Sequence, residues 1–125
     1  MPALGSTQRA HAYRWLLYLA TSVYGGALRR FRPAQHSDDS NCVESIEKTA
    51  TRGLHQYFSI LNDVINEGPF LFGANYSVVD AYLWMLVAWQ PDRDKIYAAN
   101  PKLKTLVDEV LKRPVMTRMA AEHDM

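Results

Sequence analysis

Ser77 and Asp80 are the first residues in this sequence whose types and spacing suggest chemistry. Both stand at the start of the most apolar stretch, residues 78–89, and an acid in an apolar setting is a candidate for proton transfer. The same three-residue spacing is that of a helix capping box, in which serine and acid side chains each accept from the other's backbone N–H. A carboxylate in the first turn also complements the helix dipole. We therefore expect Ser77 and Asp80 to form a structural capping box, and we predict no catalytic residue.

A second candidate site combines phenols and apolar side chains on one face of the first predicted helix: Tyr13, Leu17, Tyr24 and Leu28. Their spacing follows helical periodicity, so the four side chains would line one wall of a pocket for an apolar ligand. The alternative is that they belong to the core or to a dimer interface. For Trp84 and Trp89, the sequence favours packing in the core.

Cysteine and histidine add little further chemistry. Cys42 is the single cysteine, so it cannot form an internal disulfide, and no histidine is matched to it as an activating base. No ligand spacing such as His-x-x-x-His connects the four histidines, so no metal site is predicted; these are His11, His36, His55 and His123. The sequence also contains no P-loop, no Gly-x-Ser-x-Gly and no Gly-x-Gly-x-x-Gly motif.

The composition is that of an ordinary globular domain, with 48% hydrophobic and 22% charged residues in a chain of 125. The net charge of +1 argues against a nucleic-acid-binding protein, which usually carries a strong basic excess. The longest apolar run, residues 78–89, is shorter than the ~20 residues that a membrane-spanning helix needs. No signal-peptide pattern is present at the N-terminus. We expect a soluble, cytoplasmic protein that binds no membrane.

Helical periodicity runs through nearly the whole chain and no alternating pattern predicts a strand. The predicted helices span residues 7–32, 41–66, 77–90, 101–112 and 114–121, with residues 92–99 as a short helical or irregular bridge. We therefore predict an all-α fold, a bundle of five to six helices in a single domain over residues 1–125. The helix at 77–90 is apolar on every face, so we expect other helices to surround it.

Local signals set the ends of these helices. Asn41 and Asn100 are predicted N-caps, the first with Glu44 at the third helical position and the second followed by a proline. Paired glycines at 25 and 26 predict a bend or a close approach to the backbone. Three cations near the end of the first helix suit its dipole, although phosphate or carboxylate contacts are an alternative; these are Arg29, Arg30 and Arg32.

Five segments of this chain resemble a known family. The connector from Gly68 to Gly73, the capping segment from Tyr76 to Ala81, and the two motifs Asn100–Leu103 and Lys112–Pro114 resemble the C-terminal helical domain of cytosolic glutathione transferases. The segment from Trp15 to Thr21 resembles the first helix of that domain, closest to the bacterial beta-like enzymes. The resemblance covers essentially the whole chain and implies the bundle of the glutathione transferase C-terminal type.

The resemblance implies a function that this chain shares with another domain. Such proteins add the thiolate of glutathione, as co-substrate and with no other cofactor, to an electrophile. Their thioredoxin-like domain activates the thiol, and nothing in residues 1–125 can be that domain. The helical domain would supply a hydrophobic co-substrate site at Tyr13, Leu17, Tyr24 and Leu28 and part of a dimer surface. The expected partners are glutathione, an apolar electrophile, and either a second copy of the chain or the missing thioredoxin-like domain.

Tyr24 marks a departure from the family pattern. Beta-like relatives offer a histidine from the first helix to the substrate side, and Tyr24 stands at the aligned position. A phenol still donates a hydrogen bond but is a weaker base near neutral pH than imidazole. The resemblance equally permits an alternative, a non-catalytic module for protein–protein interaction.

Overall fold

The structure, a computed structural model, describes residues 1–65 and 67–123, and its regular elements are helical. The helices are α1 (Thr7–Tyr18), α2 (Tyr24–Phe31), α3 (Val43–Val64), α4 (Val78–Ala88), α5 (Arg93–Ala99), α6 (Pro101–Leu111) and α7 (Pro114–Glu122). No strand occurs in the described ranges, where two isolated bridges, Phe70 with Gly73 and Phe72 with Asn75, shape the connector before α4. The predicted all-α fold is confirmed.

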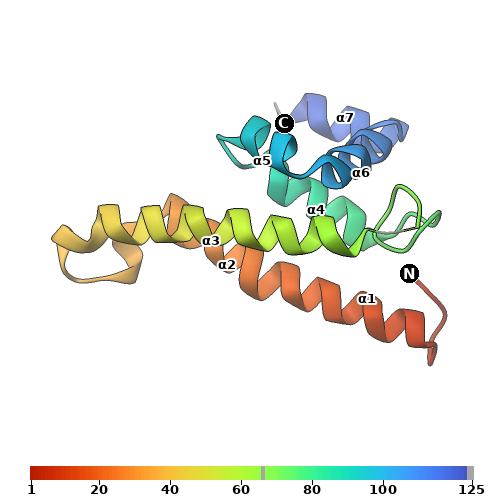
Figure 1. Ribbon diagram of the computed structural model, residues 1–125, viewed down its shortest axis with the longest axis horizontal. Helices are drawn as coiled ribbons and strands as arrows, with labels where there is room; N and C mark the ends of the chain where they lie inside the picture. The colour runs from red at the N-terminus through yellow and green to blue at the C-terminus, as the bar shows by residue number, and fades with distance from the viewer. Residues whose placement is uncertain (66, 124–125) are drawn as a thin grey trace.

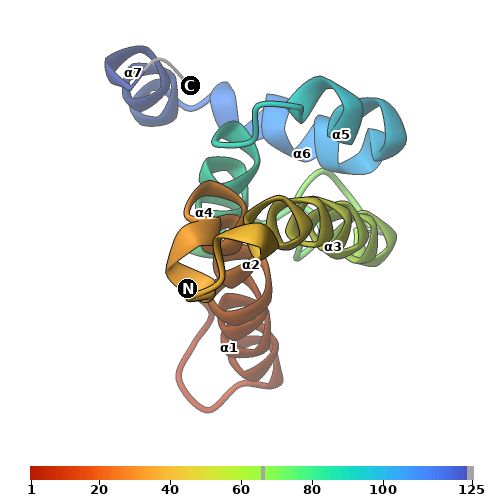
Figure 2. The same ribbon diagram turned by 90° about the vertical axis from the view of Figure 1, so that its left-hand side faces the viewer.

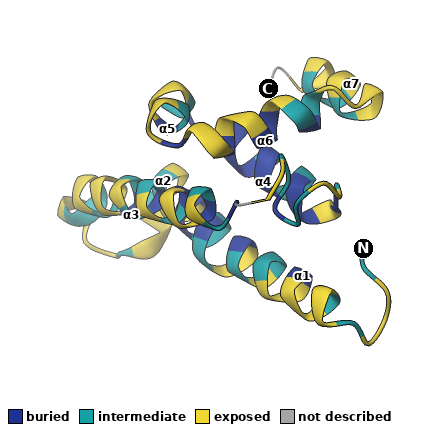
Figure 3. Ribbon diagram, turned by 45° about the vertical axis from the view of Figure 1, so that its right-hand side comes forward, coloured by how far each residue is buried: buried dark blue, intermediate teal, exposed yellow. Residues whose placement is uncertain are grey.

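The helices are arranged around α4. Figures 1 and 2 place α4 between α1–α3 on one side and α5–α7 on the other. Burial follows this arrangement, and Figure 3 shows α4 with buried residues along most of its length. Seven residues of α4 are buried: Val79, Asp80, Leu83, Trp84, Leu86, Val87 and Ala88. The apolar six of these, all except Asp80, join core residues of α1, α3 and α6 in one cluster.

The first predicted helix is interrupted by a wider turn rather than by its glycines. A π-helical turn, Leu19–Val23, joins α1 to α2, and Gly25 and Gly26 lie inside α2. Gly26 is buried against α3: a Cβ added there would lie 3.2 Å from Leu54 Cδ2. The predicted close approach therefore occurs at Gly26.

The second long helix begins later than predicted. Asp39 accepts a hydrogen bond from the Asn41 N–H at 2.9 Å, and a 3₁₀ turn, Ser40–Cys42, precedes α3. Asn41 is therefore wrong as the N-cap: Asp39 caps the 3₁₀ turn, and Cys42 stands at the N-cap of α3 without a side-chain capping bond. The helix ends at Val64, and the predicted end at residue 66 lies outside the described residues.

The capping box at the start of α4 is confirmed. Ser77 Oγ accepts from the Val79 N–H at 3.2 Å, and Asp80 Oδ2 accepts from the Ser77 N–H at 2.7 Å. Asp80 Oδ1 also accepts from the Leu71 N–H at 2.8 Å, which ties the connector to the helix. The box therefore fixes both the start of α4 and the path of the chain that leads into it.

The start of α6 is capped by a different helix. Asn100 stands at the predicted N-cap, but its side chain donates to the Ile96 carbonyl at 2.8 Å and makes no capping bond. Asn62 Oδ1 of α3 instead accepts from the Lys102 and Leu103 N–H groups at 3.0 and 3.3 Å. The N–H groups at the start of α6 are therefore capped by a side chain from α3 rather than by a residue next to them in sequence.

Within the part of the chain that the structure describes, none of the helices combines the length and apolar character that crossing a bilayer requires.

Candidate hydrophobic ligand site

A mainly apolar hollow lies between α4 and α7 and has a volume of about 650 Å³. Its walls are aromatic and thioether side chains together with one histidine; the lining residues are Val78, Ala81, Tyr82, Trp84, Met85, Trp89, Met116, Met119 and His123. We call this hollow the α4–α7 groove. Its volume falls in the range of about 300–1,000 Å³ that is usual for small-molecule sites.

The sequence of α4 explains why the groove exists. Residues 78, 81, 82, 85 and 89 recur at helical spacing and form one strip, while the opposite side of α4 enters the core. Helix α7 covers this strip only in part: Val78 is 47% exposed and Trp89 is 40% exposed. The expectation that helices surround α4 on every face is therefore wrong along this strip. Trp84 packs in the core as predicted, but the same prediction is wrong for Trp89.

Tyr24 reaches this region from α2. Its ring centroid lies 6.1 Å from that of Trp89, with a tilt of 51° between the two rings. Burial, and secondarily the proximity of Tyr24, raises the pKa of the Tyr82 phenol above 10.0. Tyr82 is therefore protonated at neutral pH and can donate a hydrogen bond to a ligand in the groove.

The other three predicted pocket residues lie elsewhere. Leu17 is 64% exposed and lines a separate hollow between α1 and α3, which includes Trp15 and Ile60. Tyr13 accepts a hydrogen bond from Arg9 Nε at 2.8 Å on the exposed side of α1. Leu28 is 37% exposed on α2 and does not line the α4–α7 groove.

The π-helical turn is the physical reason for this separation. A π turn adds one residue to the helix, so every later side chain is rotated by about 100° relative to an uninterrupted α-helix. Tyr24 and Leu28 follow the turn, whereas Tyr13 and Leu17 precede it. The four residues would share a face in an uninterrupted α-helix, but the π turn makes the later two point in a different direction from the earlier two.

Sequence reasoning nominated none of the lining residues of the groove as site residues; among those it missed are Tyr82, Met85, Met116 and Met119. The methionines of α7 were predicted only as the apolar side of a short last helix. Methionine at an incompletely covered position is a usable signal, because its flexible thioether adapts to ligands of varied shape. The sequence does not reveal which side of α4 remains uncovered, since α4 is apolar all round.

The groove is suited to binding rather than to metal chemistry. No group of three or more His, Cys, Asp or Glu side chains in the described ranges could hold a metal ion. Asp80 is 0% exposed and its oxygens bond to Leu71 and Ser77, so it presents no surface to a ligand. The polar side-chain groups of the lining residues are the Tyr82 phenol, the His123 imidazole and the indole N–H groups of two tryptophans.

Two curated proteins of Escherichia coli are similar in sequence. Glutathione S-transferase GstA of strain O157:H7 is 24% identical over 86 residues, which cover 69% of this chain and 39% of that protein. The uncharacterized GST-like protein YncG of strain K12 is 21% identical over 124 residues, which cover 99% of this chain and 60% of that protein. The chain thus matches less than two thirds of the length of either relative.

Two solved structures share the fold. A glutathione transferase from Methylococcus capsulatus superposes on the whole chain with a TM-score of 0.80 and 24% identity, and the match covers 59% of that structure. A glutathione transferase homolog from Sulfitobacter, with bound glutathione, superposes on 98% of the chain with a TM-score of 0.84 and 18% identity, covering 66% of that structure. The family model described as "Glutathione S-transferase, C-terminal domain" matches residues 31–120. With that match over most of its length, the chain belongs to the glutathione S-transferase C-terminal domain family.

Proposed function

We propose that this chain supplies the hydrophobic co-substrate site of a glutathione transferase. The α4–α7 groove carries this proposal: it is large enough for a small molecule, lined mainly by apolar side chains, and adjacent to Tyr24. The glutathione bound to the Sulfitobacter homolog supports glutathione as the second substrate. Among the residues that sequence analysis nominated, Tyr24 is the one we retain beside the groove.

In the proposed reaction the glutathione sulfur forms a bond to an electrophilic carbon. The electron pair displaced from that carbon passes to a leaving group or to a conjugated acceptor atom. Tyr82 would donate a hydrogen bond to the atom that gains this charge, because burial keeps its phenol protonated. The apolar walls would hold the electrophile away from water and orient it toward the sulfur.

Activation of the thiol is assigned to another domain in this proposal. The described groove residues offer no cation or paired base positioned to stabilise a thiolate apart from His123, which is exposed at the end of α7. We propose that a thioredoxin-like domain provides this function, either in the same polypeptide or in a partner.

A binding experiment with S-hexylglutathione tests the groove directly. Calorimetric titration of the purified chain should show tighter binding of S-hexylglutathione than of glutathione, because only the former carries an apolar tail. Met116→Glu should weaken S-hexylglutathione binding by about tenfold, since it places a charge against the tail. Val115→Glu is the matched control, because Val115 is 60% exposed on the same helix and does not line the groove.

Equal affinities of the two variants, with both still folded, would contradict the assigned site. If neither ligand binds the unchanged chain, the helices alone hold no usable site, and the chain is then either half of a two-domain enzyme or a non-catalytic interaction module.

A further inference from the structure

Arg30 is the partly buried member of the arginine cluster at the end of α2. Its Nη1 donates to Gln90 Oε1 at 3.0 Å and to Asp92 Oδ1 at 2.6 Å, and its side chain is 10% exposed. Arg29 and Arg32 are exposed, and none of the ion pairs among the described residues includes either of them. Arg30 therefore joins α2 to the segment between α4 and α5, which a cation serving only the helix dipole would not do.

Gln90 connects this contact to the end of α4. It is 1% exposed, and its side-chain nitrogen donates to the Leu86 carbonyl at 2.9 Å. That carbonyl belongs to the last turn of α4, where backbone acceptors run out of partners within the helix. The residue before Gln90 is Trp89, which stands at the C-cap of α4 and lines the α4–α7 groove. Holding Gln90 in place therefore also holds the backbone that carries the Trp89 indole.

Helix α2 meets the end of α4 at a second point, the contact between the rings of Tyr24 and Trp89 at 6.1 Å. Tyr24 and Arg30 stand near opposite ends of α2, six residues apart, which is about 9 Å along the helix axis. Two contacts that far apart restrict both the position and the tilt of this end of α4 relative to α2.

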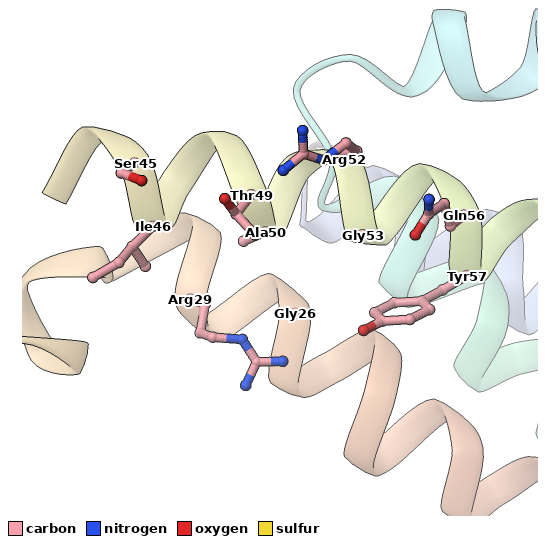
Figure 4. Close-up of a pocket in the computed structure, with 10 residues that line it drawn as sticks. All are labelled: Gly26, Arg29, Ser45, Ile46, Thr49, Ala50, Arg52, Gly53, Gln56 and Tyr57. Atoms are coloured by element: carbon pink, nitrogen blue, oxygen red, sulfur yellow. The ribbon is translucent and has the colours of Figure 1, made fainter. Parts of the chain in front are cut away.

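Helix α2 is in turn held on α3. A Cβ added at Gly26 would lie 3.2 Å from Leu54 Cδ2, so the two helices approach closely there. Figure 4 shows them side by side in close-up, with Gly26 among the residues that line the hollow between them. His55 of α3 also contacts the segment after α4, because its Nε2 lies 2.8 Å from Asp92 Oδ2. The pair α2 and α3 thus provides a close-packed base against which Arg30 holds the end of α4.

We propose that Arg30 and Gln90 are positioning residues, which hold the Trp89 indole in the place where a ligand of the α4–α7 groove contacts it. The inference rests on the proposed co-substrate role of that groove. Neither residue lines the groove, so both act through Trp89. Without Arg30 the buried Gln90 oxygen loses its donor, and an unpaired buried acceptor is costly enough to make this segment rearrange. Trp89 then shifts relative to Tyr24, and the groove fits its ligand less well.

A double-mutant cycle tests whether Arg30 acts through Trp89. Calorimetric titration with S-hexylglutathione should show about fivefold weaker binding to Arg30→Met than to the unchanged chain. In a Trp89→Ala background the same substitution should change the affinity by less than about twofold, because the residue that Arg30 positions is already absent. Arg29→Met is the matched control, since it removes the same charge from the exposed neighbouring position, and it should change the affinity by less than about twofold.

Fluorine NMR of the chain labelled with 5-fluorotryptophan reports on Trp89 without any ligand. The chain has three tryptophans, and the Trp89 signal is the one that disappears in Trp89→Phe. Arg30→Met and Gln90→Met should both shift this signal, and Arg29→Met should leave it in place. Gln90→Met keeps the ion pair between Arg30 and Asp92, so it decides the question if Arg30→Met does not fold.

The proposal is overturned if the Trp89 signal stays in place in Gln90→Met, or if Arg30→Met weakens ligand binding equally with and without Trp89. Equal weakening by Arg29→Met and Arg30→Met would also overturn it, because a general effect of charge would then explain both. If S-hexylglutathione does not bind the unchanged chain while the Trp89 signal shifts, the co-substrate role fails and the positioning of Trp89 by Arg30 and Gln90 stands.

Discussion

Asp80 illustrates, at the scale of single residues, how a buried acid is used for structure. Its carboxylate accepts hydrogen bonds from the Leu71 N–H, the Ser77 N–H and the Ser77 hydroxyl, at 2.7–2.9 Å. Burial raises the pKa of this carboxyl above 3.8, and the hydrogen bonds from Leu71 and Ser77 oppose that rise. The carboxylate thus links Leu71 of the connector to Ser77 at the start of α4.

We expect Asp80→Ala to lower the free energy of unfolding by about 2 kcal/mol, because two buried N–H groups lose their acceptor. Urea denaturation followed by circular dichroism measures this change. Asp108→Ala is the control: Asp108 pairs with Lys104 on an exposed helix face, so its loss should cost about 0.5 kcal/mol or less. Equal effects of the two substitutions would refute the structural role of Asp80.

The adjacent glycines of α2 should respond to alanine in opposite directions. A Cβ at Gly25 would meet only Arg29 Nη2 at 3.9 Å, so Gly25→Ala should stabilise the protein by about 0.5–1 kcal/mol through helix propensity. A Cβ at Gly26 would press on buried Leu54 at 3.2 Å, so Gly26→Ala should destabilise by about 1 kcal/mol or more. The melting temperatures of both variants test these two directions. A higher melting temperature for Gly26→Ala would mean that the Leu54 side chain shifts to accept the added methyl group at little cost.

At the scale of elements, hydrogen bonds between helices hold the bundle together where local sequence signals do not. Asn62 of α3 caps α6, and Asp92 at the start of α5 joins three elements. Asp92 Oδ1 lies 2.6 Å from Arg30 Nη1 of α2, and Asp92 Oδ2 lies 2.8 Å from His55 Nε2 of α3. Both sets of contacts connect residues that are distant in sequence.

The contacts of Asp92 with Arg30 and His55 should make the free energy of unfolding fall at acid pH. Burial alone would raise the pKa of Asp92, but the hydrogen bonds from Arg30 and His55 and the charge of Arg30 outweigh it and hold the pKa below 3.8. A lowered pKa in the folded state means that ionised Asp92 stabilises the fold above its unfolded-state pKa. This stabilisation is lost as the pH falls below about 4, through the folded-state value.

Asp92→Asn should therefore lower stability at pH 7 and flatten the loss of stability below about pH 4. Chemical denaturation at a series of pH values between neutrality and acid measures both effects. Asp94 lies on the exposed side of the same helix, so Asp94→Asn should leave the loss of stability at acid pH unchanged. If the free energy of unfolding falls equally steeply below about pH 4 in Asp92→Asn and in the unchanged protein, Asp92 is not the group responsible.

At the scale of the whole molecule, two exposed apolar residues from different helices lie on one face. Leu17 is 64% exposed and Ile60 is 46% exposed, and both line the hollow between α1 and α3. Contiguous apolar surface of this kind favours association with another protein surface. We propose that this face contributes the dimer surface expected for the chain.

Sedimentation velocity tests this expectation. The unchanged chain should self-associate, and Leu17→Glu should shift it toward the monomer, because a buried unpaired carboxylate opposes the interface. Leu4→Glu is the control, since Leu4 is 83% exposed and lies outside the hollow between α1 and α3. A monomeric profile for the unchanged chain would count against the dimer.

The outcome for individual residues shows how far the sequence alone can be read. Ser77 and Asp80 were predicted correctly because a capping box depends on atoms within one helical turn. Asn41 failed because Asp39, two residues away, offered a competing cap. Leu17 and Tyr24 were placed on one face because nothing in their spacing announces the π turn between them.

The sequence by itself determined the all-α fold, the central position of α4 and the resemblance to the glutathione transferase helical domain. These features follow from short-range rules, namely helical periodicity, caps and proline or glycine ends, which act within a few residues. Only the tertiary structure decided which strip of α4 stays uncovered, that Tyr24 meets Trp89, and that Asn62 caps α6. Those features depend on how helices distant in the chain pack and rotate against one another, and an all-apolar helix gives no local signal of which side its neighbours will cover.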